Sequence, residues 1–137
     1  MDARALIHAF YEEIWNRHDT SRVPALVAEG LVFRGSLGQE RHGHDEFIAY
    51  VDFVHAALGG YRCEIQEIIA EGDRAFARML FSGTHRGPFF GYPPTGRPVS
   101  WAGAAVFTFR DQKIATLWVL GDIHDLLRQL AADAEPQ

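Results

Sequence analysis

The hydrophobic period of this chain changes from helical to strand-like at Gly59-Gly60, and this change restricts the fold more than any other feature. Before it, apolar residues recur at helical spacing, and after it they alternate as they do in strands. Helices followed by a run of strands indicate an α+β fold with an antiparallel sheet, not alternating βαβ units. The length of 137 residues suits a single domain over 1–137, and we expect 131–137 to form a flexible tail.

Three helices are predicted before the change. The first runs from Asp2 to about Trp15, a short second helix begins at Asp19 or Thr20, and the third covers 43–58. Their apolar stripes need a partner surface, and the strands that follow supply it. A curved antiparallel sheet with these helices over its concave face would form a cone-shaped pocket.

The strands are predicted from short alternating segments separated by turn residues. They cover residues 31–33, 61–70, 74–84, 97–110 and 113–121. A loop over 85–96 joins the third strand to the fourth, and a short C-terminal helix opens at Asp122.

The turn at Asp111-Gln112 leaves two registers open. A two-residue turn places Phe107 and Phe109 on the face of Trp118, whereas a three-residue loop places Val106 and Thr108 there.

Composition excludes several classes of function. The net charge is -5 and no basic run is present, which argues against a nucleic-acid partner. The single cysteine, Cys63, permits no disulfide within the chain. No leader and no long apolar run is found, so we expect a cytoplasmic protein without membrane contact. His42-Gly43-His44 has no further ligand at a recognised spacing, so no metal site is predicted.

Four stretches carry a resemblance to a known family. They are Phe10-Tyr11-Glu12-Glu13-Ile14-Trp15-Asn16, Ala70-Glu71-Gly72-Asp73-Arg74, the loop around Gly91-Tyr92-Pro93-Pro94-Thr95-Gly96, and the spacing of Trp118, Asp122, Leu126 and Leu127. Together they resemble SnoaL-like polyketide cyclases of the NTF2-like superfamily. The resemblance implies an α+β cone, a homodimer formed through the sheet, and an intramolecular aldol reaction that needs no metal or organic cofactor.

Asp122 has two interpretations. The sequence Asp122-Ile123-His124-Asp125 is a good helix N-cap, and capping alone explains the aspartate. The resemblance instead places Asp122 at the position of the family's acid/base carboxylate. Trp118 and Leu120 share strand parity with Asp122, so we expect all three on the cavity side, where apolar walls would raise a carboxylate pKa.

Arg34 is the second candidate catalytic residue, at a place where the family commonly has a histidine. A cation facing the pocket could hold an ester, carboxylate or enolate oxygen, or it could pair with Asp122. The alternative is an arginine exposed on a loop.

A set of aromatic and polar residues is expected to bind a small hydrophobic molecule, because tyrosine and tryptophan pair apolar bodies with polar tips. The set comprises Tyr11, Trp15, Phe33, Phe47, Tyr50, His85, Trp101 and Trp118. For each member alone, packing in the core is the competing interpretation.

The resemblance therefore implies a cyclase of a small carbonyl compound with Asp122 as base and acid. A ketosteroid-isomerase-like isomerase is the nearest alternative reaction, and a non-catalytic binding protein is the alternative of another class. The binding protein would use the same pocket, with Asp122 serving only as a helix cap.

Overall fold

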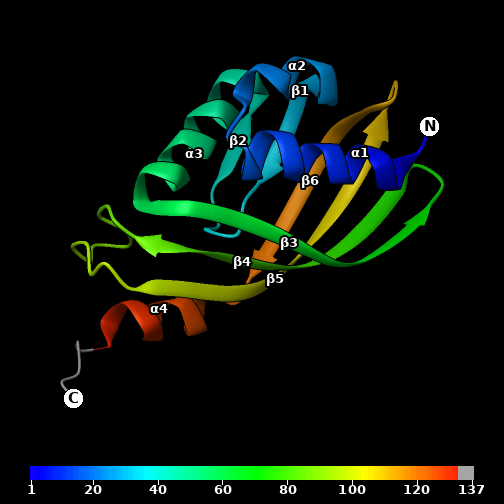
Figure 1. Ribbon diagram of the computed structural model, residues 1–137. Coiled ribbons are helices and arrows are strands. Elements are labelled where there is room, and N and C mark those ends of the chain that lie inside the picture. The colour runs from blue at the N-terminus through cyan, green and yellow to red at the C-terminus, as the bar shows by residue number, and fades with distance from the viewer. Residues whose placement is uncertain (133–137) are drawn as a thin grey trace.

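The computed structural model describes residues 1–132 as four helices packed around a curved, unclosed sheet of six strands (Figure 1). The helical segments are α1 (Ala3–Ala9), η1 (Phe10–Asn16), η2 (Thr20–Arg22), α2 (Val23–Leu26), α3 (Gly43–Ala57) and α4 (Ile123–Ala131). The strands are β1 (Val27–Arg34), β2 (Glu40–His42), β3 (Leu58–Glu71), β4 (Arg74–His85), β5 (Pro98–Arg110) and β6 (Lys113–Gly121). The α+β cone expected from the sequence is confirmed.

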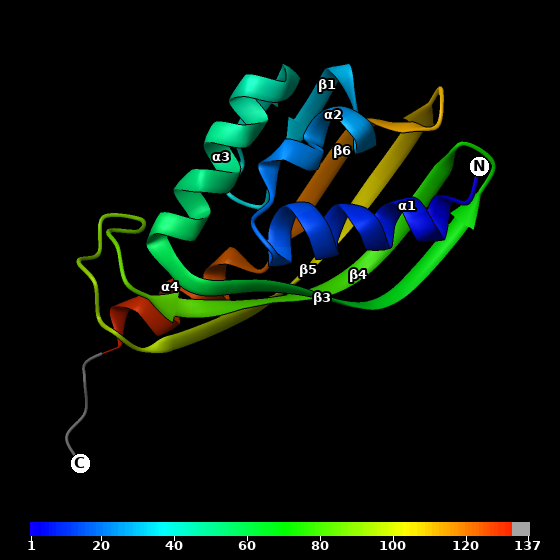
Figure 2. The same cartoon turned by 45° about the horizontal axis from the view of Figure 1, so that its top comes forward.

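The N-terminal helices lie over the concave face of the sheet, while α4 lies on the other side (Figures 1 and 2). The strand order is β2-β1-β6-β5-β4-β3. All neighbours are antiparallel except β1 and β6, which run parallel. The expectation of a purely antiparallel sheet was therefore wrong at this pair, because the last strand returns beside the first in the same direction.

Two segments differ from the sequence prediction. The first strand, predicted over 31–33, is longer in the structure, since β1 begins directly after the short α2. The tail predicted over 131–137 falls mostly outside the described residues, and Ala131 is the last residue of α4. No helix within residues 1–132 has both the length and the apolar character that a membrane crossing needs.

The turn between β5 and β6 answers the open question of register. Asp111 and Gln112 both have positive φ, 54° and 63°, as a two-residue hairpin turn requires. A bulge nevertheless follows, because Phe109 pairs with Ile114 while Thr108 pairs with Thr116. Ala115 is the extra residue, so the side chains of β6 beyond it face the opposite side from the one that a two-residue turn alone would give. Val106 and Trp118 are therefore cross-strand partners.

Two side-chain amides cover open strand edges. The amide of Asn16, at the end of η1, accepts from Cys63 N at 2.7 Å and donates to Cys63 O at 3.1 Å. The amide of Gln129 on α4 accepts from Ser100 N at 3.0 Å and donates to Ser100 O at 2.6 Å. Each amide thus bonds the strand as a neighbouring strand would.

The outer face of β5 and β6 is apolar. Val106, Trp118 and Leu120 are 38%, 47% and 53% exposed. The homodimer through the sheet stays a prediction.

Candidate functional site

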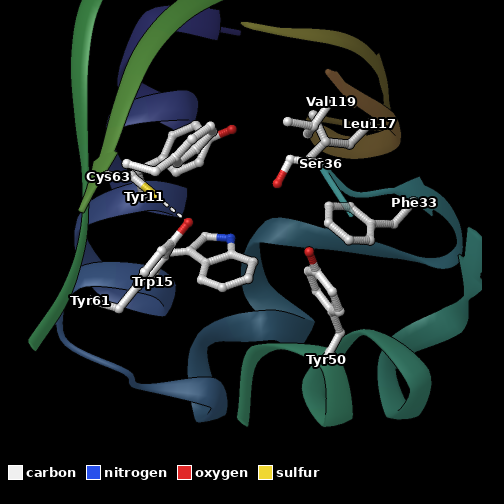
Figure 3. Close-up of a pocket in the computed structure, with 10 residues that line it drawn as sticks. Tyr11, Trp15, Phe33, Ser36, Tyr50, Tyr61, Cys63, Leu117 and Val119 are labelled. Atoms are coloured by element: carbon white, nitrogen blue, oxygen red, sulfur yellow. Dashed lines mark hydrogen bonds between the residues drawn. The ribbon is translucent and has the colours of Figure 1, made fainter. Parts of the chain in front are cut away.

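A small cavity lies between the helices and the concave face of the sheet (Figure 3). Its walls come from η1, β1, α3, β3, β4 and β6 and the loop after β1. The lining residues are Tyr11, Trp15, Phe33, Ser36, Tyr50, Tyr61, Cys63, Phe81, Leu117 and Val119. About 20 Å³ is open to the centres of water molecules, which suits roughly one ordered water.

The π-helix η1 supplies two of these side chains. Arg17 N donates to Glu12 O at 3.0 Å, which is the i to i−5 bond of a π turn. Four side chains of η1 face the interior: Phe10 and Ile14 enter the core, while Tyr11 and Trp15 line the cavity. A π turn inside a helix is frequently found at functional sites.

Neutral hydrogen-bonding groups dominate the polar part of the lining. Burial raises the pKa of the hydroxyls of Tyr11 and Tyr61 well above the ordinary value, and raises the pKa of the Cys63 thiol to about 12. The thiol donates to the Tyr61 hydroxyl at 3.5 Å. These groups therefore remain protonated at neutral pH and can act as hydrogen-bond donors.

Tyr50 connects α3 to the loop after β1. Burial raises the pKa of its hydroxyl to about 12, against the opposing effects of hydrogen bonds with Ser36 and Leu37 and of the positive charge of Arg41. The hydroxyl points into the cavity between Phe33 and Ser36 (Figure 3). Gly35 is required here, because a Cβ on it would lie 2.8 Å from the Tyr50 hydroxyl oxygen.

Four of the predicted binding residues line the cavity together: Tyr11, Trp15, Phe33 and Tyr50. Their contact with a substrate stays a prediction.

Two further members of the predicted set are buried behind this wall. Phe47 is fully buried, with its ring 4.9 Å from that of Phe33. Trp101 packs against Phe81 with a centroid distance of 5.3 Å, and its indole Nε1 is buried without a hydrogen-bond partner among the described residues.

His85 lies at the end of β4, fully buried beneath the loop that follows it. Its Nδ1 is 3.0 Å from the hydroxyl of Thr95. His85 belongs to the set expected to bind a small molecule, but it is not among the residues that line the cavity. The loop folds back over the ring, since the backbones of His85 and Gly96 are hydrogen-bonded.

Trp118 and Arg34 lie on the outer face of the sheet. The guanidinium carbon of Arg34 is 5.3 Å from the centre of the Trp118 ring, and an Arg34 N–H donates to Val119 O. The expected cavity position is wrong for both, because Phe33, Leu117 and Val119 occupy the inward positions of the same two strands.

Asp122 follows β6 and caps α4. Its Oδ1 accepts from Asp125 N at 3.1 Å, and the residue is exposed and outside the cavity lining. Trp118 and Leu120, which were expected on the cavity side with it, are exposed at 47% and 53% and face outward. Its catalytic role stays a prediction.

The residue before Asp122 nevertheless packs against the cavity wall. A methyl group on the preceding Gly121 would lie 2.8 Å from Ser36 Cβ and 2.9 Å from Trp101 Nε1. Ser36 itself lines the cavity, so the backbone before Asp122 passes directly behind that wall.

Sequence reasoning missed six lining residues, namely Ser36, Tyr61, Cys63, Phe81, Leu117 and Val119. The alternation of Tyr61 and Cys63 along β3 was a usable signal, as was that of Leu117 and Val119 along β6. Ser36 lies on a loop and gave no such signal. Within residues 1–132, no three His, Cys, Asp or Glu side chains converge as metal ligands.

Comparisons with known proteins point to one family. The chain is similar to AclR of Streptomyces galilaeus, a candidate hydroxylase, with 28% identity over 93% of both chains and a TM-score of 0.80. It is similar to IdmH of Streptomyces antibioticus, a candidate polyketide cyclase, with 26% identity over 96% of this chain and 100% of the other and a TM-score of 0.84. TsrD of Streptomyces laurentii shares 26% identity over 96% of each chain, with a TM-score of 0.83.

No curated protein matches the chain. The family model described as SnoaL-like polyketide cyclase matches residues 5–130, which include every residue of the cavity wall. With its cone-shaped fold and this family match, the chain belongs to the SnoaL-like polyketide cyclase family.

Proposed function

We propose that this protein closes a ring in a small polyketide-type carbonyl compound by a cofactor-independent aldol reaction at the cavity of Figure 3. The observation that carries the proposal is the set of protonated hydroxyl donors, Tyr11 and Tyr50 above all, on an aromatic wall. Donors of this kind stabilise the negative charge that develops on an enolate oxygen, most strongly where water is excluded. The described size of the cavity requires side chains to move apart as a substrate enters.

Asp122 serves as the proton carrier in this proposal. Its carboxylate removes a proton from the carbon beside a carbonyl, and the resulting enolate carbon forms a bond with a second carbonyl carbon of the same molecule. Asp122 then returns the proton to the new alkoxide, so no other reagent is consumed. To do this the carboxylate must exchange its bond with Asp125 N for a position beside Ser36, past Gly121.

In this proposal Arg34 is a positioning residue. Its N–H group donates to the backbone oxygen of Val119, whose side chain lines the cavity. This bond holds the parallel pair of β1 and β6 together where both contribute to the wall. Arg34 therefore acts through Val119 and does not contact the substrate.

A non-catalytic binding function is the second candidate, and one observation favours it. The Asp122 carboxylate already caps α4 through Asp125 N, which leaves the cavity lining without an acid or base. A binding protein needs no more than the donors and the aromatic wall.

The test is the variant Asp122→Asn, with Asp125→Asn as the matched control on the same helix. Asparagine caps a helix about as well as aspartate, so folding should be preserved while the base is lost. Turnover of a panel of aromatic polyketones, followed by liquid chromatography and mass spectrometry, should fall at least about 100-fold in Asp122→Asn only.

The panel should also be measured for binding by calorimetry. Turnover that survives in Asp122→Asn would remove the aspartate from the mechanism. Binding by the unmodified protein with no turnover of any compound would favour the non-catalytic function.

A further inference from the structure

A second hollow adjoins the cavity on the outside of its wall. It is a groove of about 350 Å³, lined by Leu37, Gln39, Arg41, Phe53, Phe89 and Phe90. Ligand sites for drug-sized molecules measure about 300–1,000 Å³, so the groove has the size of such a site. The cavity, at about 20 Å³, does not. A substrate with several rings therefore needs space beyond the cavity, and the groove provides it.

Exposed aromatic rings form one side of this groove. Phe53 on α3 is 46% exposed and Phe90 is 39% exposed. The ring centres of Phe53 and Phe89 are 6.1 Å apart, and those of Phe89 and Phe90 are 4.8 Å apart. Large apolar side chains gathered in one exposed patch mark a site that binds an apolar partner.

The backbone at Phe90 supports the same conclusion. Phe89 and Tyr92 are bridged by two hydrogen bonds, so Phe90 and Gly91 form the tip of a tight turn. Phe90 has a φ of 51°, a conformation in which glycine or asparagine is common and a bulky side chain is an outlier. The chain thus accepts local strain to hold a large ring at this point beside the groove.

Arg41 supplies the polar side of the groove. Its guanidinium donates to Gln39 at 2.7 Å and lies 5.1 Å from the centre of the Tyr50 ring. Among residues 1–132, no carboxylate lies within ion-pair distance of it. The N–H groups that Gln39 does not occupy lie at the edge of the guanidinium, and a carboxylate fits such a fork through two hydrogen bonds.

The groove and the cavity share a wall. Arg41 stacks on one side of Tyr50, while the Tyr50 hydroxyl points into the cavity (Figure 3). Leu37 lines the groove and follows Ser36, which lines the cavity. A ligand seated in the groove therefore lies next to the group proposed to hold its reactive carbonyl.

We propose that the groove binds an aromatic ring bearing a carboxylate, with the ring against Phe53 and Phe90 and the carboxylate on Arg41. The substrate of the proposed cyclisation is accordingly an aromatic polyketide acid, and this part of the inference rests on the proposed function. The binding of the aromatic acid itself does not depend on any reaction.

The experiment compares 1-naphthoate with the neutral 1-naphthamide as probes, with calorimetry as the measurement. We expect the unmodified protein to bind the acid at least about tenfold more tightly, and this preference to disappear in Arg41→Gln. Arg41→Lys should retain part of it, since the charge remains but the fork is lost. Phe53→Ala should weaken both probes by a similar factor.

Arg110→Gln is the matched control, because it removes the same charge from an exposed position at the far end of β5. It should bind both probes as the unmodified protein does, and thermal unfolding should show that each variant is folded. Equal binding of acid and amide by the unmodified protein, or an unchanged preference in Arg41→Gln, would overturn the groove assignment.

The two proposals fail in different ways. An Arg41-dependent preference for naphthoate, together with no turnover of any aromatic polyketone, would leave the groove standing and reject the cyclase. Turnover that depends on Asp122 but is equal for acids and amides, with KM unchanged in Arg41→Gln, would support the cyclase and reject the groove.

Discussion

The cavity and the groove lie on opposite sides of Tyr50, yet they have opposite chemical character. The cavity is small and its polar groups are neutral hydroxyls and a thiol. The groove is larger and holds a cation among exposed rings. A charge in the cavity would pay the full desolvation cost, whereas Arg41 keeps part of its contact with water. The difference suggests that recognition of charge belongs outside and stabilisation of developing charge inside.

The largest expected effect separates two phenylalanines of the same helix. Phe47 is fully buried against Phe10 and Phe33, and Phe47→Ala should lower the free energy of unfolding by about 3–5 kcal/mol. Phe53, in the groove, is 46% exposed. Phe53→Ala should therefore change the free energy of unfolding by no more than about 0.5–1 kcal/mol. Urea unfolding of both variants measures the difference. Equal losses would mean that the groove is part of the core.

A smaller effect tests whether the cavity excludes water around Tyr50. Its folded pKa is raised from the ordinary 10 to about 12, so the unfolded chain loses its proton first as pH rises. The stability that the Tyr50 hydroxyl contributes is therefore complete below pH of about 10 and is lost as the pH rises from about 10 to about 12. At pH 11 the loss from this group is about 1.4 kcal/mol. Tyr50→Phe keeps the ring and should reduce the loss between pH 8 and pH 11 by that amount.

The measurement is urea unfolding of both proteins at the two pH values. Tyr11 and Tyr61 also have raised pKa values, so the variant should retain part of the alkaline loss. An identical loss in both proteins would show that the Tyr50 hydroxyl ionises as it does in water.

The smallest effect concerns the opposite side of the cavity wall. The Nε2 of His55 is 2.7 Å from the backbone oxygen of Trp15, its ring stacks on His18 at 3.9 Å, and His18 contacts Asp52 at 2.7 Å. Burial lowers the pKa of His55, with a smaller lowering from His18, against a hydrogen bond with Trp15 and the charge of Asp52, which raise it.

Because the folded pKa is depressed, the unfolded chain binds the proton first as pH falls. Stability is therefore complete above the unfolded pKa of about 6.5 and is lost as pH falls below it, by less than about 1 kcal/mol for this half-buried group. His55→Gln should flatten the change in melting temperature between pH 7 and pH 5, while His124→Gln, at an exposed position, should not. A steeper change in His55→Gln would mean that folding raises the pKa of His55 and does not lower it.

The fold could be predicted because its signals are local. Helical spacing before Gly59-Gly60 and alternation after it are properties of neighbouring residues. The pairing of β1 with β6 joins segments some 80 residues apart, and no local pattern records which strands meet or in which direction. The short β2, of three residues, carried no alternation that could be recognised.

The side chains of the candidate site were also only partly predictable from local patterns. Strand parity correctly grouped Trp118 with Leu120, but parity says nothing about which face is inward. The bulge at Ala115 then placed Val106 on the side of Trp118 despite the two-residue turn. Both faces of β6 are apolar, so hydrophobicity could not choose between Trp118 and its neighbours Leu117 and Val119. Tyr11 and Tyr50 line the cavity, and they were chosen for their residue type, since a tyrosine pairs an apolar ring with a polar tip.

The amides of Asn16 and Gln129 bear on how this protein behaves at high concentration. An open strand edge offers free N–H and C=O groups on which another chain can add a strand, and fibrils grow by that route. Asn16 occupies both backbone groups of Cys63 on β3, and Gln129 occupies both backbone groups of Ser100 on β5. Replacing either amide with alanine should open a nucleation point for fibrils while leaving the cavity lining intact.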